Sequence, residues 1–150
     1  MYTTDVQHII FFQGAIPSSA IVELLQSASP GNRTGANSIF LGRVRADLIG
    51  KETVSSIFYT AYEQMVLEKM QEINKTIHEK YPITYLKVYQ SLGYVAVEEI
   101  CLTVFAASAH RKAAIEACNE TVELVKSELP IWGKEQFAGS GHHWKINKER

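Results

Sequence analysis

The order of helical and strand-like patterns along the 150-residue sequence predicts an α+β fold. A long helix is expected over residues 108–129, because its apolar side chains recur at spacings of three and four. These side chains are Ile115, Cys118, Val122, Val125 and Leu129. Runs rich in β-branched and aromatic residues surround it and predict the strands of a sheet. A chain of this length suits one domain, residues 1–150, with a single core.

Composition excludes several classes of function. The net charge of −1 gives no basic footprint, which argues against nucleic-acid binding as the main activity. No apolar run approaches the length needed to span a membrane, and the first residues lack the basic region of a signal peptide. We therefore expect a cytoplasmic protein that uses neither nucleic acid nor a membrane.

Neither the cysteines nor the histidines indicate a metal site. Cys101 and Cys118 are too far apart for a C-x-x-C pair and are expected to be buried thiols. His142 and His143 lack a cysteine or carboxylate at ligand spacing nearby. We expect no bound metal and no cofactor.

The beginning of the chain is expected to support the rest of the fold. Residues 6–12 predict a strand, and Pro17-Ser18-Ser19 opens a helix that ends in the breakers of residues 27–32. A further strand is expected over residues 35–45, with an isolated glycine, Gly42, marking a bulge or a close backbone approach.

Arg43 and Arg45 follow Gly42 on alternate residues. Their side chains point the same way if the strand continues. The alternative is an exposed strand end with two solvated arginines.

A hairpin and a second helix are expected in the middle of the chain. Residues 47–52 form a turn around Gly50, and the strands at residues 35–45 and 54–62 should pair antiparallel across it. Residues 63–80 then read as a helix that lies on this hairpin. One face of the helix would carry Met65, Lys69, Ile73 and Ile77, with Met70 beside them.

The expected central strand is the run at residues 97–107, because it is apolar on both faces. Before it, residues 84–90 alternate as a strand, and Leu92-Gly93 breaks the pattern. Beyond the long helix, Pro130 prevents continuation and residues 131–137 predict another strand. A loose turn at residues 138–141, a returning strand at residues 142–146 and a polar tail complete the chain.

The long helix carries cations at both ends. Ser108 is the expected N-cap. His110 and Arg111 lie in the first turn, where the helix dipole disfavours a cation, and Arg111 precedes Ile115 by four residues, on the line of the apolar face. This placement favours a bound anion, since free amides at a helix start bind phosphate or carboxylate. Lys126 lies beside the apolar face; alternatively, Arg111 caps a carbonyl and Lys126 extends to solvent.

Four segments, taken together, resemble the large, catalytic subunit of molybdopterin synthase. They are G-A-N-S-I-F-L-G-R-V-R (35–45), Y-T-A-Y-E-Q-M (59–65), S-A-H-R-K-A-A-I-E-A (108–117) and V-K-S-E-L-P-I-W-G-K-E (125–135). The resemblance implies an α/β-hammerhead arrangement: a mixed or antiparallel sheet with packed helices and a small β-rich portion. It also implies a homodimer of large subunits within a heterotetramer.

The implied activity is that of a sulfurtransferase in molybdenum cofactor biosynthesis. It would convert cyclic pyranopterin monophosphate to molybdopterin, with sulfur from the C-terminal thiocarboxylate of a small ubiquitin-like subunit. By position, the resemblance implies catalytic roles for Lys126 and Lys134, and a substrate pair in His110 and Arg111 to which a second copy can contribute. The implied substrate-binding set is Arg43, Val44, Arg45, His110, Arg111, Lys126, Gly133, Lys134 and Glu135.

The sequence also departs from the family pattern. Relatives usually have a second lysine directly after the tryptophan, where this chain has Gly133 and then Lys134. Neighbouring strand residues point to opposite faces, so Lys134 can substitute only if a bulge at Gly133 re-aims it. Gln90 and Ser91 stand where relatives often have His-Arg.

Two other functions remain as alternatives. One is a non-catalytic homologue that binds the small subunit or a phosphorylated pterin as a regulator, which Gly133 keeps open. The other is a generic nucleotide-phosphate-binding module. The absence of a G-x-x-x-x-G-K-[ST] loop argues against this second alternative.

Overall fold

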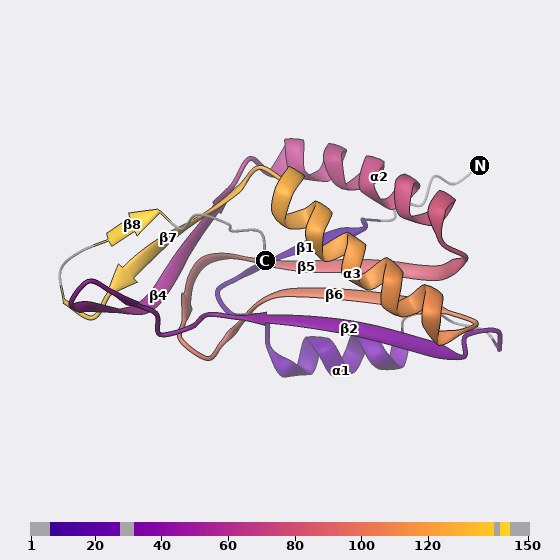
Figure 1. Ribbon diagram of the computed structural model, residues 1–150, viewed down its shortest axis with the longest axis horizontal. Helices are drawn as coiled ribbons and strands as arrows, with labels where there is room; N and C mark the ends of the chain where they lie inside the picture. The colour runs from indigo at the N-terminus through magenta and orange to yellow at the C-terminus, as the bar shows by residue number, and fades with distance from the viewer. Residues whose placement is uncertain (1–6, 28–31, 140–141, 145–150) are drawn as a thin grey trace.

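The computed structural model describes residues 7–27, 32–139 and 142–144 (Figure 1). Its elements, in chain order, are β1 (Ile9–Gln13), α1 (Ser18–Ser27), β2 (Ala36–Arg43), β3 (Leu48–Ile49), β4 (Glu52–Ala61), α2 (Glu63–Lys80), β5 (Ile83–Ala96), β6 (Ile100–Ser108), α3 (Arg111–Glu128), β7 (Ile131–Phe137) and β8 (His142–Trp144). The whole predicted tail lies outside the described residues. So do parts of the predicted first strand, of the loose turn and of the last strand. That residues 1–150 form one domain stays a prediction.

The strands form one mixed sheet in the order β2-β6-β5-β4-β7-β8. Neighbours along this path are antiparallel, whereas β1 adds to β5 in parallel and β3 adds to the start of β4. The predicted α+β class, with a mixed sheet and packed helices, is confirmed.

The predicted central strand is β6, and all nine of its residues are buried. It lies between β2 and β5 and pairs antiparallel with both. It begins at Ile100 rather than at residue 97, because residues 97–99 form the turn from β5, in which Glu98 has a φ of 75°. An apolar sequence on both faces is what a strand covered on both faces requires.

The expected break at Leu92-Gly93 is a bend within a single 14-residue strand, β5. The part of β5 before the bend pairs with β6, and the part after it pairs with β4. Gly93 has a φ of 80°, a conformation that glycine adopts without strain. The bend carries the chain from the main sheet into the smaller β-rich portion formed by β3, β4, β7 and β8, at the left of Figure 1.

The expected hairpin between residues 35–45 and 54–62 is wrong. β2 pairs with β6, whereas β4 pairs with β5 and β7. The turn at residues 47–52 instead holds β3, which makes a short hairpin with the first two residues of β4. The two strands are adjacent in sequence but belong to different portions of the sheet, so adjacency alone gave the wrong partner.

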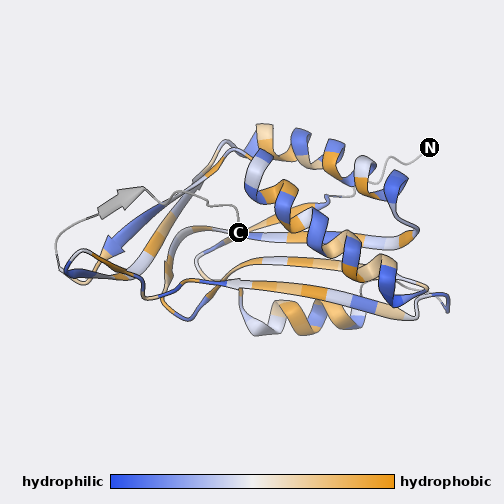
Figure 2. Ribbon diagram, in the orientation of Figure 1, coloured by the Kyte–Doolittle hydropathy of each residue, from blue (hydrophilic) through white to orange (hydrophobic). Residues whose placement is uncertain are grey.

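Helices cover both faces of the main sheet (Figure 1). α2 and α3 lie side by side on one face and α1 lies on the other. Alternate residues of β6 serve the two layers: Val104 and Ala106 belong to the core cluster beneath α2 and α3, and Phe105 and Ala107 to the cluster beneath α1. Figure 2 shows apolar residues along these strands and polar residues recurring on the helices. No helix in the described ranges is long and apolar enough to cross a membrane.

The buried faces of the two long helices differ from prediction near their starts. Cys118, Val122, Val125 and Leu129 are buried as predicted, but Ile115 is 56% exposed. Ala114 and Ala117 are buried in its place and allow α3 to approach the sheet closely. Met65 in α2 is likewise 56% exposed, while Val66 and Met70 are buried. In both helices the periodic spacing predicts the buried face correctly beyond the first turn, but near the start a neighbouring residue is buried instead.

The predicted N-cap of α3 is also wrong. Ser108 is the last residue of β6, and α3 begins at Arg111 with His110 as the N-cap residue. The Ser108 hydroxyl donates a hydrogen bond to the carbonyl of His110. The serine therefore shapes the turn between β6 and α3 instead of capping a helical amide.

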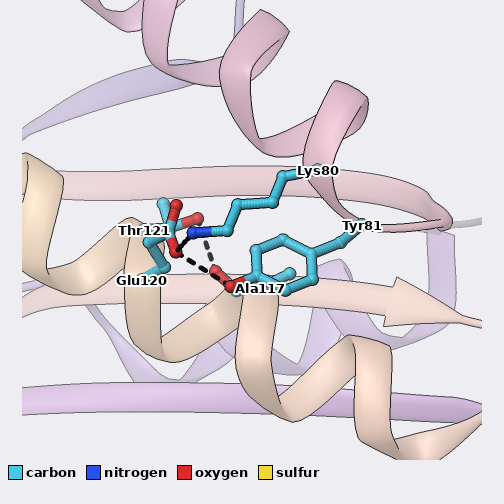
Figure 3. A network of polar contacts seen from close by, with 5 residues as sticks. All are labelled: Lys80, Tyr81, Ala117, Glu120 and Thr121. Atoms are coloured by element: carbon cyan, nitrogen blue, oxygen red, sulfur yellow. Dashed lines mark hydrogen bonds and ion pairs between the residues drawn. The ribbon is translucent and has the colours of Figure 1, made fainter.

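A polar network joins α2 to α3 at the surface (Figure 3). The Lys80 ammonium lies 2.6 Å from Oε1 of Glu120, and the Tyr81 hydroxyl donates to the same oxygen at 2.8 Å. These contacts, Lys80 first, lower the pKa of the Glu120 carboxyl. Next to Glu120, the Thr121 hydroxyl donates a hydrogen bond to the carbonyl of Ala117, one turn earlier in α3, at 2.7 Å. The network fixes the end of α2 against the middle of α3.

Two substitutions in α3 test the observed helix face. Val125→Ala removes two buried methyl groups and should lower the free energy of unfolding by about 2 kcal/mol. Ile115→Ala should change it by no more than about 0.5 kcal/mol, because Ile115 is exposed. Urea unfolding followed by circular dichroism measures both; equal losses would contradict the observed face.

Candidate functional site

The two predicted arginines lie where β2 leaves the main sheet. Arg43 is the last residue of β2, and its guanidinium donates to the carbonyl of Glu98 at 2.6 Å. Arg45 forms a two-point contact with Asp47, in which Nε and Nη2 lie 3.2 Å from Oδ1 and Oδ2 respectively. Both arginine side chains are exposed. Because both side chains of the pair are exposed, an anionic ligand can reach Arg45 and compete with Asp47 for it.

Val44, between the two arginines, fixes the backbone from which their side chains extend. Its side chain is only 2% exposed and belongs to the main core cluster. Its N–H donates to the carbonyl of Glu99 at 3.2 Å, and its carbonyl accepts from the N–H of Glu98 at 2.8 Å. The predicted bulge is confirmed as well, because the β2–β6 register shifts between Gly42 and Arg43. Val44 therefore anchors the segment, and its predicted contact with substrate stays a prediction.

The predicted residues Gly133, Lys134 and Glu135 lie in the middle of β7. They pair with Tyr59, Phe58 and Ile57 of β4, in that order. Glu135 is only 5% exposed. Since strand residues alternate in direction, Gly133 and Glu135 face one side of the β4–β7 pair and Lys134 faces the other.

The hypothesis that a bulge at Gly133 re-aims Lys134 is wrong. The β4–β7 ladder is regular from the Ala61–Ile131 pair to the Ile57–Glu135 pair, and its one shift lies between Val54 and Ser56. Gly133 is instead covered by two side chains of β4: a Cβ there would lie 2.9 Å from Cγ2 of Ile57 and 3.2 Å from Cε1 of Tyr59. The sequence places Tyr59 in a predicted strand and at the start of the segment at residues 59–65, but its pairing with Gly133 could not be predicted from local pattern.

Lys126 lies in the last turn of α3, where the helix dipole favours a cation. It is exposed. Two residues after the end of α3, the Pro130 carbonyl accepts a hydrogen bond from the Tyr62 N–H at 3.2 Å, which ties the start of β7 to the end of β4. Lys126 therefore stands at the end of α3 that leads into β7.

His110 and Arg111 lie at the start of α3. His110 has the extended backbone of an N-cap residue (φ −125°, ψ 147°) but its side chain makes no capping hydrogen bond. Both side chains are exposed. The expectation that Arg111 lies on the buried face is wrong, because its helical neighbour Ile115 faces solvent. The argument from the helix dipole is unaffected, since two cationic or potentially cationic side chains flank free amides there.

Within one chain the structure does not bring these groups together. Arg111 and Lys126 are separated by the length of α3, about 22 Å at 1.5 Å per residue. The strands agree: Ala36 at the start of β2 pairs with Ser108, next to the start of α3, whereas Arg43 pairs with Ile100 at the far end of β6. Figure 1 shows the two ends of α3 at different ends of the sheet. The predicted site is thus split between a His110–Arg111 end and an end that holds Lys126.

The prediction that both cysteines are buried thiols is confirmed. Cys101 and Cys118 are buried free thiols, as predicted, and burial raises the pKa of Cys118. Among the described residues, no group of three or more histidine, cysteine or carboxylate side chains could hold a metal ion. The backbones of His142 and His143 pair with β7, but their side chains lie outside what the structure describes.

Sequence comparisons relate the chain to one group of proteins. A family model described as MoaE protein matches residues 15–128. A molybdopterin synthase catalytic subunit of Rattus norvegicus is 36% identical over 115 residues, which are 77% of this chain and 57% of that protein. Molybdopterin synthase catalytic subunit 1 of Aedes aegypti is 38% identical over 118 residues, 77% of this chain and 76% of the relative. The chain spans only about 57–60% of the length of the rat, bovine and human relatives.

Solved structures share the fold. Molybdopterin synthase from Staphylococcus aureus matches with a TM-score of 0.79 and 27% identity, over 93% of this chain and 96% of that one. A complex of subunits 1 and 2 of molybdopterin-converting factor from Helicobacter pylori 26695 matches with a TM-score of 0.76 and 20% identity, over 91% of this chain and 88% of that one. The mixed sheet with helices on both faces is therefore a known arrangement.

The crowding around Gly133 can be tested by adding one methyl group. Gly133→Ala should lower the free energy of unfolding by about 1–3 kcal/mol, because its Cβ would press on Ile57 and Tyr59. Gly139→Ala is the matched control, since the nearest atom to its Cβ would be 3.9 Å away. Denaturant midpoints measure both; an unchanged Gly133→Ala midpoint would show that β4 can yield without cost.

Proposed function

The chain belongs to the MoaE protein family, and we propose on that basis that it is the catalytic subunit of a molybdopterin synthase. In this proposal it converts cyclic pyranopterin monophosphate to molybdopterin. The sulfur comes from the C-terminal thiocarboxylate of a small ubiquitin-like subunit. The observation that carries the proposal is the set of exposed basic side chains, Arg45, His110, Arg111 and Lys126, at the positions where the family resemblance implies the site.

Lys126 is the proposed catalytic residue. Each transfer forms a carbon–sulfur bond on the pterin in place of a carbon–oxygen bond. It also breaks the acyl carbon–sulfur bond of the carrier, whose terminal carbon takes oxygen from water and becomes a carboxylate. Negative charge develops on sulfur and oxygen during these steps, and a positioned ammonium stabilises it. Lys126 can serve this role because it is exposed at the end of α3 that leads into β7.

His110 and Arg111 are the proposed binding groups for the substrate phosphate. The start of a helix supplies free amides and a positive dipole end, and these two side chains flank it. They lie about 22 Å from Lys126 along α3 in the same chain. We therefore propose a homodimer in which one copy supplies the phosphate-binding end and the other supplies Lys126, with a small subunit bound to each copy.

Lys134 has a weaker claim to a catalytic role. The regular pairing of β7 places it on the opposite face from Gly133 and Glu135. In our proposal the chemistry therefore depends on Lys126, and no bound metal or cofactor is invoked. A cytoplasmic location stays a prediction. The rival function, a regulator that binds the small subunit or a phosphorylated pterin without turnover, draws its support from Gly133.

A reconstituted reaction tests the enzyme. Purified protein, thiocarboxylated small subunit and cyclic pyranopterin monophosphate are mixed, and dithiolene product is followed. Lys126→Ala should lower the rate at least about 100-fold through loss of charge stabilisation. Lys75→Ala removes an exposed lysine of α2 and should leave the rate unchanged. Absence of product from the wild type, despite a measurable complex with the small subunit, would favour the regulator.

Mixing two inactive variants tests the shared site. Arg111→Ala and Lys126→Ala are each expected to be inactive alone. When they are co-expressed, half of the dimers contain one copy of each, and one of the two sites in such a dimer is intact. About a quarter of wild-type turnover should return. No recovery in dimers shown by mass spectrometry to be mixed would mean that both residues serve a site within one chain.

A further inference from the structure

Gly35 lies against the turn that carries His110 and Arg111. It directly precedes β2, and its N–H donates a hydrogen bond to the carbonyl of Ser108, the last residue of β6, at 2.9 Å. A Cβ at this position would collide with the carbonyl oxygen of Ala109 and lie 3.3 Å from the carbonyl carbon. The φ of Gly35 is not positive. The close approach of the turn, and not an unusual backbone conformation, is therefore what requires glycine here.

The residues around this contact hold it at the end of the sheet. Ser108 pairs with Ala36 of β2 on one side and with Ile83 of β5 on the other. Close to these partners, the hydroxyls of Thr34 and Thr84 lie 3.2 Å apart, and one donates a hydrogen bond to the other. Because β6 lies between β2 and β5 in the sheet, this bond crosses β6 at its end. The turn from β6 to α3 therefore begins where three strands are held together.

The conformation of this turn sets the direction of the His110 side chain and of the first amides of α3. The Ser108 hydroxyl donates to the carbonyl of His110, which has the extended backbone of an N-cap residue. The His110 side chain makes no capping hydrogen bond, so it leaves the amides of the first helical turn unoccupied. A shift of the Ala109 carbonyl would therefore move the groups that are proposed to bind the substrate phosphate.

We propose that Gly35 is a positioning residue of the His110–Arg111 end, where the absence of a side chain allows the start of β2 to hold the turn before α3. The inference rests on the proposed function, which makes this end the binding site of the substrate phosphate. Gly35 and Ala109 both lie at the surface. An added methyl group is therefore accommodated by displacement of the turn, with little change in the core. β2 thereby contributes to both ends of the split site, since its last residue is Arg43.

Steady-state kinetics of Gly35→Ala test the positioning role. In the reconstituted reaction this variant should raise KM for cyclic pyranopterin monophosphate about tenfold, the effect of losing one charge-assisted hydrogen bond to the phosphate. Its kcat should stay within about twofold of the wild-type value, because the end that holds Lys126 is unchanged. A Gly35→Ala protein with the wild-type KM, or one that loses kcat at an unchanged KM, would overturn the proposal.

Two further variants separate positioning from folding, and the denaturant midpoint of each protein is measured in parallel. Ser108→Ala removes the hydrogen bond to the His110 carbonyl and should raise KM about fivefold. Ile73→Val is the stability control, because it removes one buried methyl group from α2 and should lower the midpoint while keeping the wild-type KM. A KM that rises in Ile73→Val as it does in Gly35→Ala would overturn the proposal and leave Gly35 a structural residue. A wild-type KM in Ser108→Ala would overturn the link between the turn and phosphate binding.

A readout without turnover separates this proposal from the proposed function. Inorganic phosphate is added to the protein, and the amide resonances of Arg111 and Lys112 are followed by NMR. The dissociation constant for phosphate should be about tenfold higher in Gly35→Ala than in the wild type. If the wild type makes no product but this weakening is seen, the proposed function fails and the positioning role stands. An equal dissociation constant, or no phosphate-dependent shift at Arg111 in the wild type, overturns the positioning role whether or not product forms.

Discussion

Complete burial of β6 is the constraint on which the rest of the structure depends. A strand with no side chain in water needs a partner on each edge and a layer on each face. β2 and β5 supply the edges, α1 covers one face, and α2 and α3 cover the other. Because α3 follows β6 directly, it can cover that face only by folding back along the strand. That reversal places His110 at one end of the sheet and Lys126 at the other.

The smaller β-rich portion depends on the bend in β5. The strand leaves β6 after Gln90 and pairs with β4 from Gly93 onward, so one continuous element belongs to both portions. β4 and β7 are thereby held beside the end of β2, where the arginine segment begins. Tyr59 of β4 lies at this junction, where it pairs with Gly93 at the bend and with Gly133 of β7. The proposed site is thus assembled by long-range pairing, and none of its parts is formed by a single local motif.

The sequence predicted what local patterns determine. The helices, the buried central strand, the bulge at Gly42 and the strand at residues 131–137 follow from periodicity and from single residues with strong preferences. Strand partners did not follow, since β2 and β4 are neighbours in sequence and yet pair elsewhere. Helical spacing predicted that Ile115 and Met65 are buried, whereas packing buries Ala114, Ala117, Val66 and Met70 instead. Local pattern indicated the arginines after Gly42 and the cations at the two ends of α3, whereas Val44, Gly133, Lys134 and Glu135 came from family resemblance. Which of these groups lie together in one chain required the three-dimensional structure.

The length of α3 has a consequence for how such a chain can change. The helix joins His110 and Arg111 to Lys126 without an intervening loop, so it acts as a rigid spacer between two functional ends. One inserted residue would rotate everything beyond it by about 100° and lengthen the spacer by about 1.5 Å. Either end could then keep its register only if the other lost it. Insertions and deletions should therefore be confined to connections outside this helix, where a change in length leaves the spacing of the two ends intact.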